Sequence, residues 1–442
     1  MRIGTFVHLF EWSHGDVAIE CEAFLGPKNF SAVQVSPPNE HIVGDEWWTR
    51  YQPVSYALES RSGSHEAFVD MVKRCKAVGV DVIVDVVVNH MAAGSEGVGV
   101  NGTHYTNRNF DPLYSPDDFH HSESDNQSNC QVNDYNDLEN VQKCDLVGLP
   151  DLDTSSPKVQ KTIASYLDNL LEAGVAGFRL DASKHQESEA LGQYLSQMSS
   201  TTVPYVFCEV IEGDEEAVKA EMYFDYCDVT EFNFAQEVGS NIVSPGKMKF
   251  LSGVGSSWGL IPSDSAVTFT DNHDTQRGNA PLTYKDGPLY DVFNIFLLTS
   301  DYGYPKLMSS YEFDDPDQGP PDSSPCDGHG WVCEHRRYGG LVAWRISAGE
   351  NEVSNFQSLD DGEGDVICFS RGNAAFVAIN RSEDTFVLKC GTETNLRAGT
   401  YYNVLDDNES TIDIDESGKV SNDIEIGAMG AVALHLGAMH EY

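Results

Sequence analysis

The stretch GVAGFRLDASKH, residues 174–185, changes from apolar to charged within a few positions. Its apolar run, 175–178, leads directly into Arg179 and Asp181, and Lys184 and His185 follow. The buried strands of a parallel α/β barrel present functional side chains in this way, because these leave the packed interior at the C-terminal end of each strand. Asp181 is therefore a candidate nucleophile. A simpler interpretation is that it caps the following helix and pairs only with Arg179.

Other runs of strand length recur along the chain, separated by segments with helical spacing of apolar residues such as 68–78 and 159–172. The run DVIVDVVVNH, 81–90, is too continuously β-branched for a half-exposed strand and is typical of a parallel sheet covered on both faces. The predicted strands lie in 2–10, 31–36, 81–90, 177–180, 205–209, 229–232, 266–269 and 306–309. Eight such strands predict a closed (β/α)8 TIM barrel.

Two segments do not follow the barrel pattern. Residues 91–150 are rich in Gly, Asn, Asp, Ser and His and too long for a plain loop, which predicts a subdomain inserted after the third strand. From about residue 365, short alternating segments are broken by Gly, Asn and Asp, which predicts an all-β domain, a Greek-key β-sandwich. We therefore assign 1–90 and 151–362 to the barrel (domain A), 91–150 to the inserted subdomain B and 363–442 to domain C.

The charge balance excludes some partners. The 442 residues include 70 acidic and 27 basic side chains, a formal net charge of −43. Such a field repels nucleic acid and anionic membrane surfaces and favours a neutral or cationic partner. No apolar span reaches membrane length, and nothing in the sequence indicates an oligomer, so we expect a monomer without a membrane partner.

The ten cysteines are an even number and include no Cys-x-x-Cys spacing. This usage predicts disulfides and an oxidising compartment, and no signal peptide precedes Arg2. We interpret the sequence as the mature form of a secreted, extracellular protein.

Four predicted strand ends carry the same change from apolar to charged or imidazole side chains: DVVVNH (85–90), GFRLDASKH (177–185), EVIE (209–212) and FTDNHD (269–274). A barrel would gather all four at one mouth. Together they resemble the four sequence regions of the α-amylase family of glycoside hydrolases. The resemblance to animal-type α-amylases extends to HLFEW (8–12), WWTRYQPVSY (47–56), DNHDTQRG (271–278), LMSSYEF (307–313) and WVCEHR (331–336).

The resemblance implies retaining endo-hydrolysis of internal α-1,4-glucosidic bonds in starch, glycogen and maltooligosaccharides. Asp181 would be the nucleophile, Glu209 the general acid/base and Asp274 the carboxylate that stabilises the transition state. One rival is a relative that acts on the same bonds by transglycosylation or exo-cleavage. Another is a non-catalytic barrel that only binds glycan or a protein; such barrels typically lose part of the carboxylate set, which is complete here.

The resemblance also assigns glucan contacts. Aromatic faces stack on pyranose rings, which favours glucan contacts for Trp47, Trp48 and Tyr51. The alternative is that these three side chains belong to the core and that His90 and His273 are buried structural histidines. The predicted contacts are Trp47, Trp48, Tyr51, Gln52, His90, Arg179, Lys184, His185, Glu216 and His273.

A calcium ion joins the inserted subdomain to the barrel in this family. The matching ligands are the side chains of Asn89 and Asp151 and the main-chain carbonyls of Gln142 and His185. Hard oxygen donors of this kind suit Ca²⁺.

Many animal-type enzymes also bind an activating chloride between two cations and an Asn. Arg179 and Asn272 match two of these ligands, but we place Glu312 at the position of the second cation. A carboxylate repels chloride, so we predict that Glu312 pairs with Arg179 and that the enzyme needs no chloride.

The resemblance pairs Cys21 with Cys75, Cys130 with Cys144, and Cys326 with Cys333. Two further pairs are predicted from position: Cys208 with Cys227, on neighbouring strands, and Cys368 with Cys390, within the β domain. The segment GNAPLTYKDG, 278–287, is shorter than the mobile glycine-rich loop of the mammalian enzymes, which implies a more open cleft.

Overall fold

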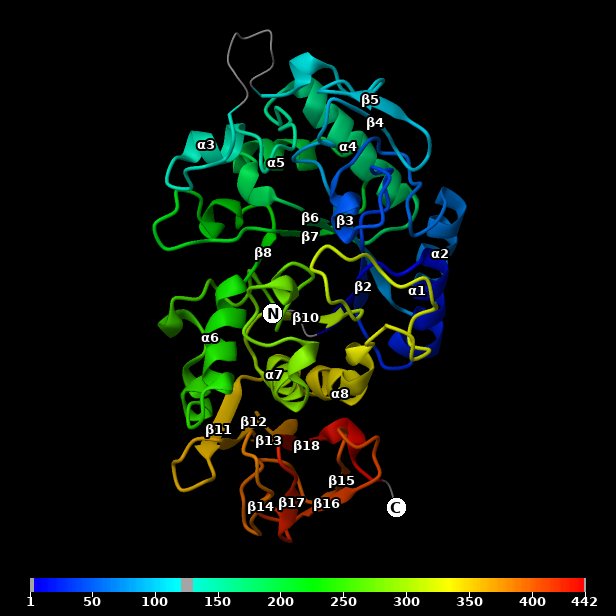
Figure 1. The fold of residues 1–442 in the computed structure, drawn as a ribbon. Helices are drawn as coiled ribbons and strands as arrows, with labels where there is room; N and C mark the ends of the chain where they lie inside the picture. Colours follow the sequence, from blue (N-terminus) through cyan, green and yellow to red (C-terminus); the bar gives the residue numbers. More distant parts are fainter. Residues whose placement is uncertain (1–3, 121–129, 441–442) are drawn as a thin grey trace.

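Eight parallel strands form a closed barrel in the computed structural model, which describes residues 4–120 and 130–440 (Figure 1). The strand order around the barrel is β1-β10-β9-β8-β7-β6-β3-β2. The strands are β1 (Phe6–Leu9), β2 (Ala32–Val35), β3 (Asp81–Val86), β6 (Gly177–Leu180), β7 (Tyr205–Cys208), β8 (Asp228–Thr230), β9 (Ala266–Thr268) and β10 (Tyr304–Ser309). Each lies within or overlaps a predicted strand, which confirms the TIM barrel.

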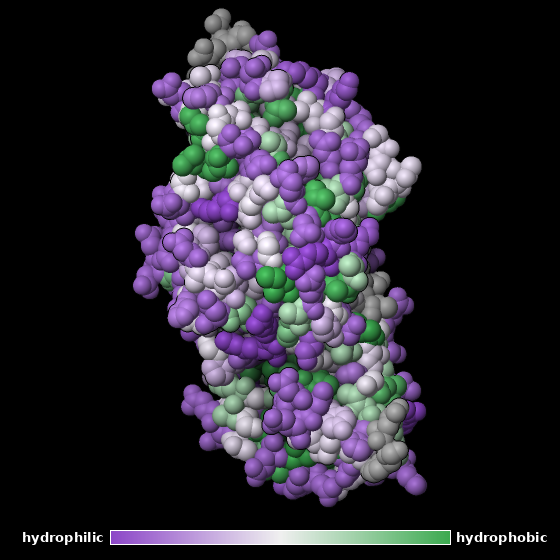
Figure 2. Space-filling view, turned by 90° about the vertical axis from the view of Figure 1, so that its right-hand side faces the viewer, coloured by the Kyte–Doolittle hydropathy of each residue, from purple (hydrophilic) through white to green (hydrophobic). Residues whose placement is uncertain are grey.

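Helices cover the outside of the barrel because their apolar residues recur on one face. In α4 (Pro157–Glu172), Val159, Ile163, Leu167 and Leu170 are buried and the proline stands in the first turn, where its missing N–H costs no hydrogen bond. The other outer helices are α1 (His14–Glu20), α2 (His65–Ala77), α5 (Ser188–Ser196), α6 (Phe232–Val243), α7 (Pro288–Thr299) and α8 (Gly339–Ala348). The face that carries α1 and α2 is mostly hydrophilic, with apolar residues in small scattered patches (Figure 2).

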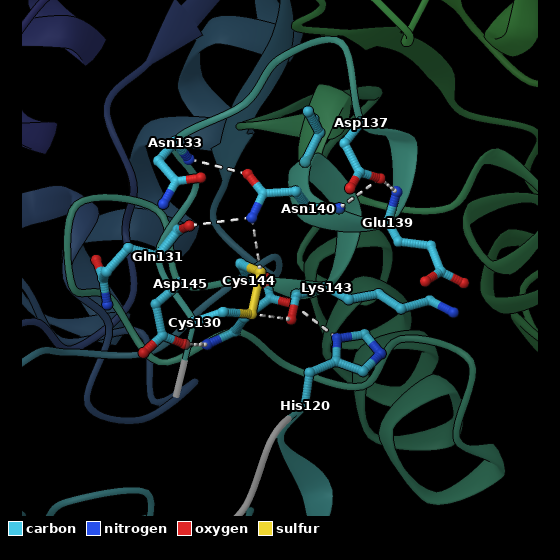
Figure 3. Close-up of a disulfide and its surroundings, with 12 residues drawn as sticks. His120, Cys130, Gln131, Asn133, Asp137, Glu139, Asn140, Lys143, Cys144 and Asp145 are labelled. Carbon is cyan, nitrogen blue, oxygen red and sulfur yellow. Dashed lines mark hydrogen bonds and ion pairs between the residues drawn. A yellow bond between two sulfur atoms is a disulfide. The ribbon is translucent and has the colours of Figure 1, made fainter. Parts of the chain in front are cut away.

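The inserted subdomain stands at one end of the barrel (Figure 1). It contains the hairpin of β4 (Glu96–Val98) and β5 (His104–Thr106) and the short helix α3 (Leu138–Lys143). Around the Cys130–Cys144 disulfide, the Asn140 side chain accepts hydrogen bonds from the backbone N–H groups of Asn133 and Asp134 at 2.9 Å and donates to the Gln131 carbonyl at 3.1 Å (Figure 3). One amide thus organises a segment with little regular structure.

Domain C is all-β, as predicted. Its four-stranded antiparallel sheet has the order β11-β12-β13-β18, and two further pairs, β14 with β17 and β15 with β16, accompany it. The strands are β11 (Val353–Ser358), β12 (Val366–Arg371), β13 (Ala375–Asn380), β14 (Phe386–Leu388), β15 (Gly399–Tyr402), β16 (Thr411–Ile414), β17 (Ile424–Ile426) and β18 (Gly430–His435). The sheet begins at Val353, before the predicted boundary at 363. The sequence does not reveal this strand, because β11 is half-buried and largely polar and lacks an apolar alternation.

A buried arginine of strand β12, Arg371, joins domain C to the barrel. Its Nη1 atom donates to the carbonyls of Thr299 and Ser300, and Arg345, in helix α8 of the barrel, donates to those of Ser300 and Gly303. These carbonyls lie at and after the end of α7, where a helix leaves acceptors without partners. The interface is therefore specific and hydrogen-bonded.

Four of the five predicted disulfides are confirmed: Cys21–Cys75, Cys130–Cys144, Cys208–Cys227 and Cys326–Cys333. The predicted Cys368–Cys390 pair is wrong. Cys368 is buried in the core of domain C, whereas Cys390 is exposed on a loop, and both are free thiols in the part of the chain that the structure describes. Within the same part, no helix combines the length and apolar character needed to cross a membrane.

Candidate active site

The Arg179 side chain, on β6, lies at the centre of the barrel mouth and is fully buried. Its Nη1 atom donates to Asp85 Oδ1 at 2.6 Å and to Asp181 Oδ1 at 2.8 Å, and its Nη2 atom donates to Glu209 Oε1 at 2.5 Å. Asp85 belongs to β3, and the other two carboxylates directly follow β6 and β7. One guanidinium therefore gathers carboxylates from three adjacent strands.

The backbone fixes the Glu209 side chain from a second direction, because the Ala182 N–H donates to its Oε2 atom at 3.0 Å. Burial raises the pKa of Asp181 well above its ordinary value, and the negative charges of Glu209 and Asp85 add to the rise, while Arg179 opposes it. Burial raises the pKa of Asp85 as well. Burial and mutual repulsion thus disfavour the ionised forms of Asp181 and Asp85, whereas the charge of Arg179 favours them.

Asp274 lies on the open side of this cluster, with 43% of its side chain exposed. The Asn272 Oδ1 atom accepts from the N–H groups of Asp274 and Thr275, which fixes the turn after β9. Desolvation and then the charge of Glu209 raise the pKa of Asp274, whereas the nearby arginines oppose the rise. All three predicted catalytic carboxylates therefore lie at one mouth and interact electrostatically.

An aromatic wall stands beside the carboxylates. The His273 ring stacks between Tyr51, at 5.1 Å between ring centroids, and Phe10, at 5.0 Å, and the Trp47 ring meets its edge at 5.6 Å. The Nε2 atom of His90 lies 2.9 Å from the Tyr51 carbonyl oxygen. Burial holds the pKa of both imidazoles below the ordinary value, so both rings are neutral at pH 7.

Two other predicted glucan contacts lie at the edge of this group. Trp48 is half-buried in the same 3-10 turn as Trp47 and Tyr51 (Trp47–Tyr51). The Gln52 side chain accepts from the Ala93 N–H at 3.1 Å, so it joins this turn to the inserted subdomain.

The opposite rim is formed by Lys184 and Glu216. The Lys184 ammonium donates to Glu216 Oε2 and to the Ile211 carbonyl, both at 2.6 Å, and lies 4.5 Å from the centroid of the Tyr135 ring. Sequence reasoning missed Tyr135, which is one of five aromatic residues in the polar insertion and carries no signal that sets it apart. The Tyr135 carbonyl accepts from the Ala217 N–H, so the inserted subdomain contacts this rim directly.

The predicted calcium ligands lie in two pairs of neighbouring segments. The Oδ1 atoms of Asn89 and Asp151 are buried and have no hydrogen-bond partner among the described residues, and the two segments meet at the His90–Asp151 β-bridge. The His185 ring nitrogen Nδ1 lies 2.9 Å from the Val141 carbonyl, which brings the segment of Gln142 beside that of His185. Two orphaned oxygen atoms of this kind fit a hard cation.

The predicted pair of Arg179 with Glu312 is wrong. Within the described residues Arg179 forms its ion pairs with Asp85, Asp181 and Glu209, and the Glu312 side chain is exposed on the loop that follows β10. The buried cation near Arg179 is Lys306, which interrupts the apolar pattern of β10. Burial, and then the charge of Arg179, lowers the pKa of Lys306 to about 8.

Comparisons with known proteins agree with this geometry. The family "Alpha amylase, catalytic domain" matches residues 47–301, and "Alpha amylase, C-terminal all-beta domain" matches 356–437. The alpha-amylase-related protein of Drosophila melanogaster is 41% identical over 465 residues, which cover 98% of this chain and 91% of the relative. That of Drosophila mauritiana is also 41% identical, covering 98% and 94%.

Among solved structures, α-amylase I of Eisenia fetida, as a glutamate-to-glutamine mutant in complex with maltohexaose, superimposes with a TM-score of 0.90 at 34% identity. The match covers 98% of this chain and 97% of that one. A gamma-CGTase from an alkalophilic Bacillus clarkii shares the fold, with a TM-score of 0.73 at 18% identity. The barrel, the carboxylate cluster and these matches together show that the chain belongs to the α-amylase family of glycoside hydrolases.

Proposed function

We propose that this protein is a secreted α-amylase that hydrolyses internal α-1,4-glucosidic bonds of starch and glycogen with retention of configuration. The observation that carries the proposal is that the Arg179 guanidinium donates hydrogen bonds to both Asp181 and Glu209. Retaining cleavage requires two carboxyl groups about 5–5.5 Å apart, and groups that share one guanidinium are necessarily close.

In the proposed reaction Asp181 attacks the anomeric carbon while Glu209 gives its proton to the leaving oxygen, and the glycosidic C–O bond breaks. A water molecule, deprotonated by Glu209, then cleaves the glycosyl–Asp181 ester. Asp274 faces the developing positive charge of the oxocarbenium-like transition state. The acid role of Glu209 requires that this side chain carry a proton before the first step.

Glucan binding is assigned to the two rims. Trp47 and Tyr51 offer aromatic faces beside the neutral His273, His90 orients the Tyr51 segment through its carbonyl, and the Lys184–Glu216 pair stands on the opposite side. The maltohexaose complex of the Eisenia fetida enzyme supports an oligosaccharide substrate. The four disulfides support secretion.

A structural calcium would be held by the side chains of Asn89 and Asp151 and by the carbonyls of Gln142 and His185. When bound, the ion cross-links the inserted subdomain to the barrel and neutralises the buried carboxylate. The orphaned Oδ1 atoms support this assignment.

Chloride independence loses its basis with the exposed position of Glu312. We propose instead that an anion binds at Arg179, Lys306 and Asn272. The Asn272 Oδ1 atom is engaged by two backbone N–H groups, which leaves its amide nitrogen as the donor for an anion. A chloride there would offset the repulsion between the two buried cations.

The decisive experiment compares the wild type with Glu209→Gln on soluble starch. We expect the variant to lose at least 10³-fold in kcat; equal rates would reject the assignment. Product analysis over time on a blocked maltooligosaccharide separates internal hydrolysis from exo-cleavage and transglycosylation. A barrel that only binds glycan would retain maltohexaose in both forms and release no sugar from either.

A further inference from the structure

The Arg277 guanidinium is enclosed by aromatic rings. Its central carbon lies 4.4 Å from the centroid of Phe313, 4.9 Å from Trp47, 5.2 Å from Phe10 and 5.5 Å from Tyr311. These rings come from three separate segments, after β1, at residue 47 and after β10. A cation among ring faces is attracted to each of them, and the attraction grows as water is excluded.

Hydrogen bonds fix the orientation of the same group. Nη1 donates to the His273 carbonyl, Nη2 to the Tyr311 hydroxyl at 2.9 Å, and Nε to the Pro316 carbonyl at 3.0 Å. The Nε1 atom of Trp47 donates to the same Pro316 carbonyl at 2.8 Å. Arg277 and Trp47 therefore share an acceptor as well as a stacking contact.

The backbone links Arg277 to the catalytic turn. Arg277 ends the 3-10 turn η9 (Thr275–Arg277), and its N–H donates to the Asp274 carbonyl at 3.0 Å. Its side chain returns to the carbonyl of His273. Arg277 thus contacts Asp274 through a backbone hydrogen bond and Trp47 through the stacking of its guanidinium on the indole ring.

We propose that Arg277 is a positioning residue, which sets the distance and angle between the Trp47 ring and the Asp274 carboxylate across the glucan cleft. This inference rests on the proposed function, because it assigns Trp47 to a sugar ring and Asp274 to the transition state of the same substrate. Arg277 touches neither substrate nor reacting atoms; it acts through its neighbours.

The chemistry requires arginine. A guanidinium stacks as a plane and donates in fixed directions, whereas a lysine ammonium is a compact point charge. Lysine would keep the attraction to the rings but could not reproduce the fork of donors to three acceptors. Methionine would keep the volume of the stem and lose both.

The test uses Arg277→Lys and Arg277→Met, with Arg337→Met as the matched control. Arg337 is half-exposed and pairs with Asp291, away from the cleft residues. On soluble starch we expect kcat/KM to fall at least 30-fold in Arg277→Met through both a lower kcat and a higher KM. Arg277→Lys should recover part of the kcat, and Arg337→Met should match the wild type.

A second measurement does not depend on hydrolysis. The emission of Trp47, taken as the difference between each protein and its Trp47→Phe counterpart, should shift in Arg277→Met, and maltohexaose affinity should fall at least fivefold. In the Trp47→Phe background, Arg277→Met should cost less in kcat/KM than in the wild type.

The inference would be overturned if Arg277→Met had the same kcat, KM and Trp47 emission as the wild type. It would also be overturned if the loss of activity only followed the fraction of folded protein. If the wild type hydrolyses no glucan, the proposed function fails, while the emission and affinity measurements still decide the role of Arg277.

Discussion

Asp85 is bonded at both carboxylate oxygens, with the Arg179 guanidinium at 2.6 Å from Oδ1 and the Tyr51 hydroxyl at 2.9 Å from Oδ2. It therefore belongs to the support of the site, and its negative charge acts on Asp181 through the shared arginine. This charge is one of the causes that raise the pKa of Asp181, after burial and Glu209.

The pH profile of Asp85→Asn tests this relationship. An acid with a raised pKa ionises only at higher pH, so wild-type kcat/KM should fall on the acid side at a pH above about 3.9, the value of an ordinary Asp. Removal of the Asp85 charge should move this limb to lower pH by at least half a unit. A limb that stays in place, measured on maltohexaose from pH 3 to 9, would show that Asp85 does not act on the nucleophile.

Removal of calcium should weaken both stability and activity. Without a cation, two buried oxygens of Asn89 and Asp151 lack partners, and each such group costs about 1–3 kcal/mol. We expect EGTA to lower the melting temperature by several degrees and added Ca²⁺ to restore it. Asn89→Ala should need more Ca²⁺ for the same recovery, and an unchanged melting curve in EGTA would refute the site.

Chloride should activate the enzyme through Lys306. In protein dialysed free of halide, we expect kcat to rise several-fold with added chloride, and Lys306→Met should abolish the response. Glu312→Gln is the control, because that side chain is exposed and should leave the titration unchanged. If the kcat of the wild type does not change with added chloride, the proposed anion site is rejected and the enzyme is chloride-independent.

The Cys208–Cys227 disulfide should stabilise the strand end that carries Glu209. It closes a loop with a sequence separation of 19, for which a chain-entropy estimate is about 3 kcal/mol. We expect the double variant Cys208→Ser/Cys227→Ser to lose about 2–4 kcal/mol in urea unfolding and to lose kcat earlier on heating. The Cys326→Ser/Cys333→Ser variant, with a separation of 7, is the control and should lose less.

The barrel and its carboxylates could be predicted because both depend on local order. Strands such as 81–86 are continuous β-branched runs, and the residues that follow them are charged, so the strand ends mark the mouth without knowledge of the packing. Barrel closure places the strand ends that carry Asp181, Glu209 and Asp274 at one mouth, and the family resemblance selects these three carboxylates.

The misses depend on distances between remote segments. Lys306 directly precedes the motif LMSSYEF, which contains Glu312, and only the folded barrel shows that the lysine is buried and the glutamate exposed. Cys368 and Cys390 share a domain but lie in its core and on its surface. Strand β11 is recruited by its partner β12, a tertiary effect that overrides a polar sequence.

The contact of Arg371 between domain C and the barrel has a consequence for the cooperativity of the molecule. Arg371 occupies the carbonyls of Thr299 and Ser300 just before β10, the strand that carries Lys306. A chain cut before Val353 would remove the Arg371 contacts to these carbonyls, so we expect the barrel alone to be less stable than the full chain. Exchanging domain C between relatives should therefore alter the heat tolerance of the proposed activity, although none of the residues that we assign to the active site lies in that domain.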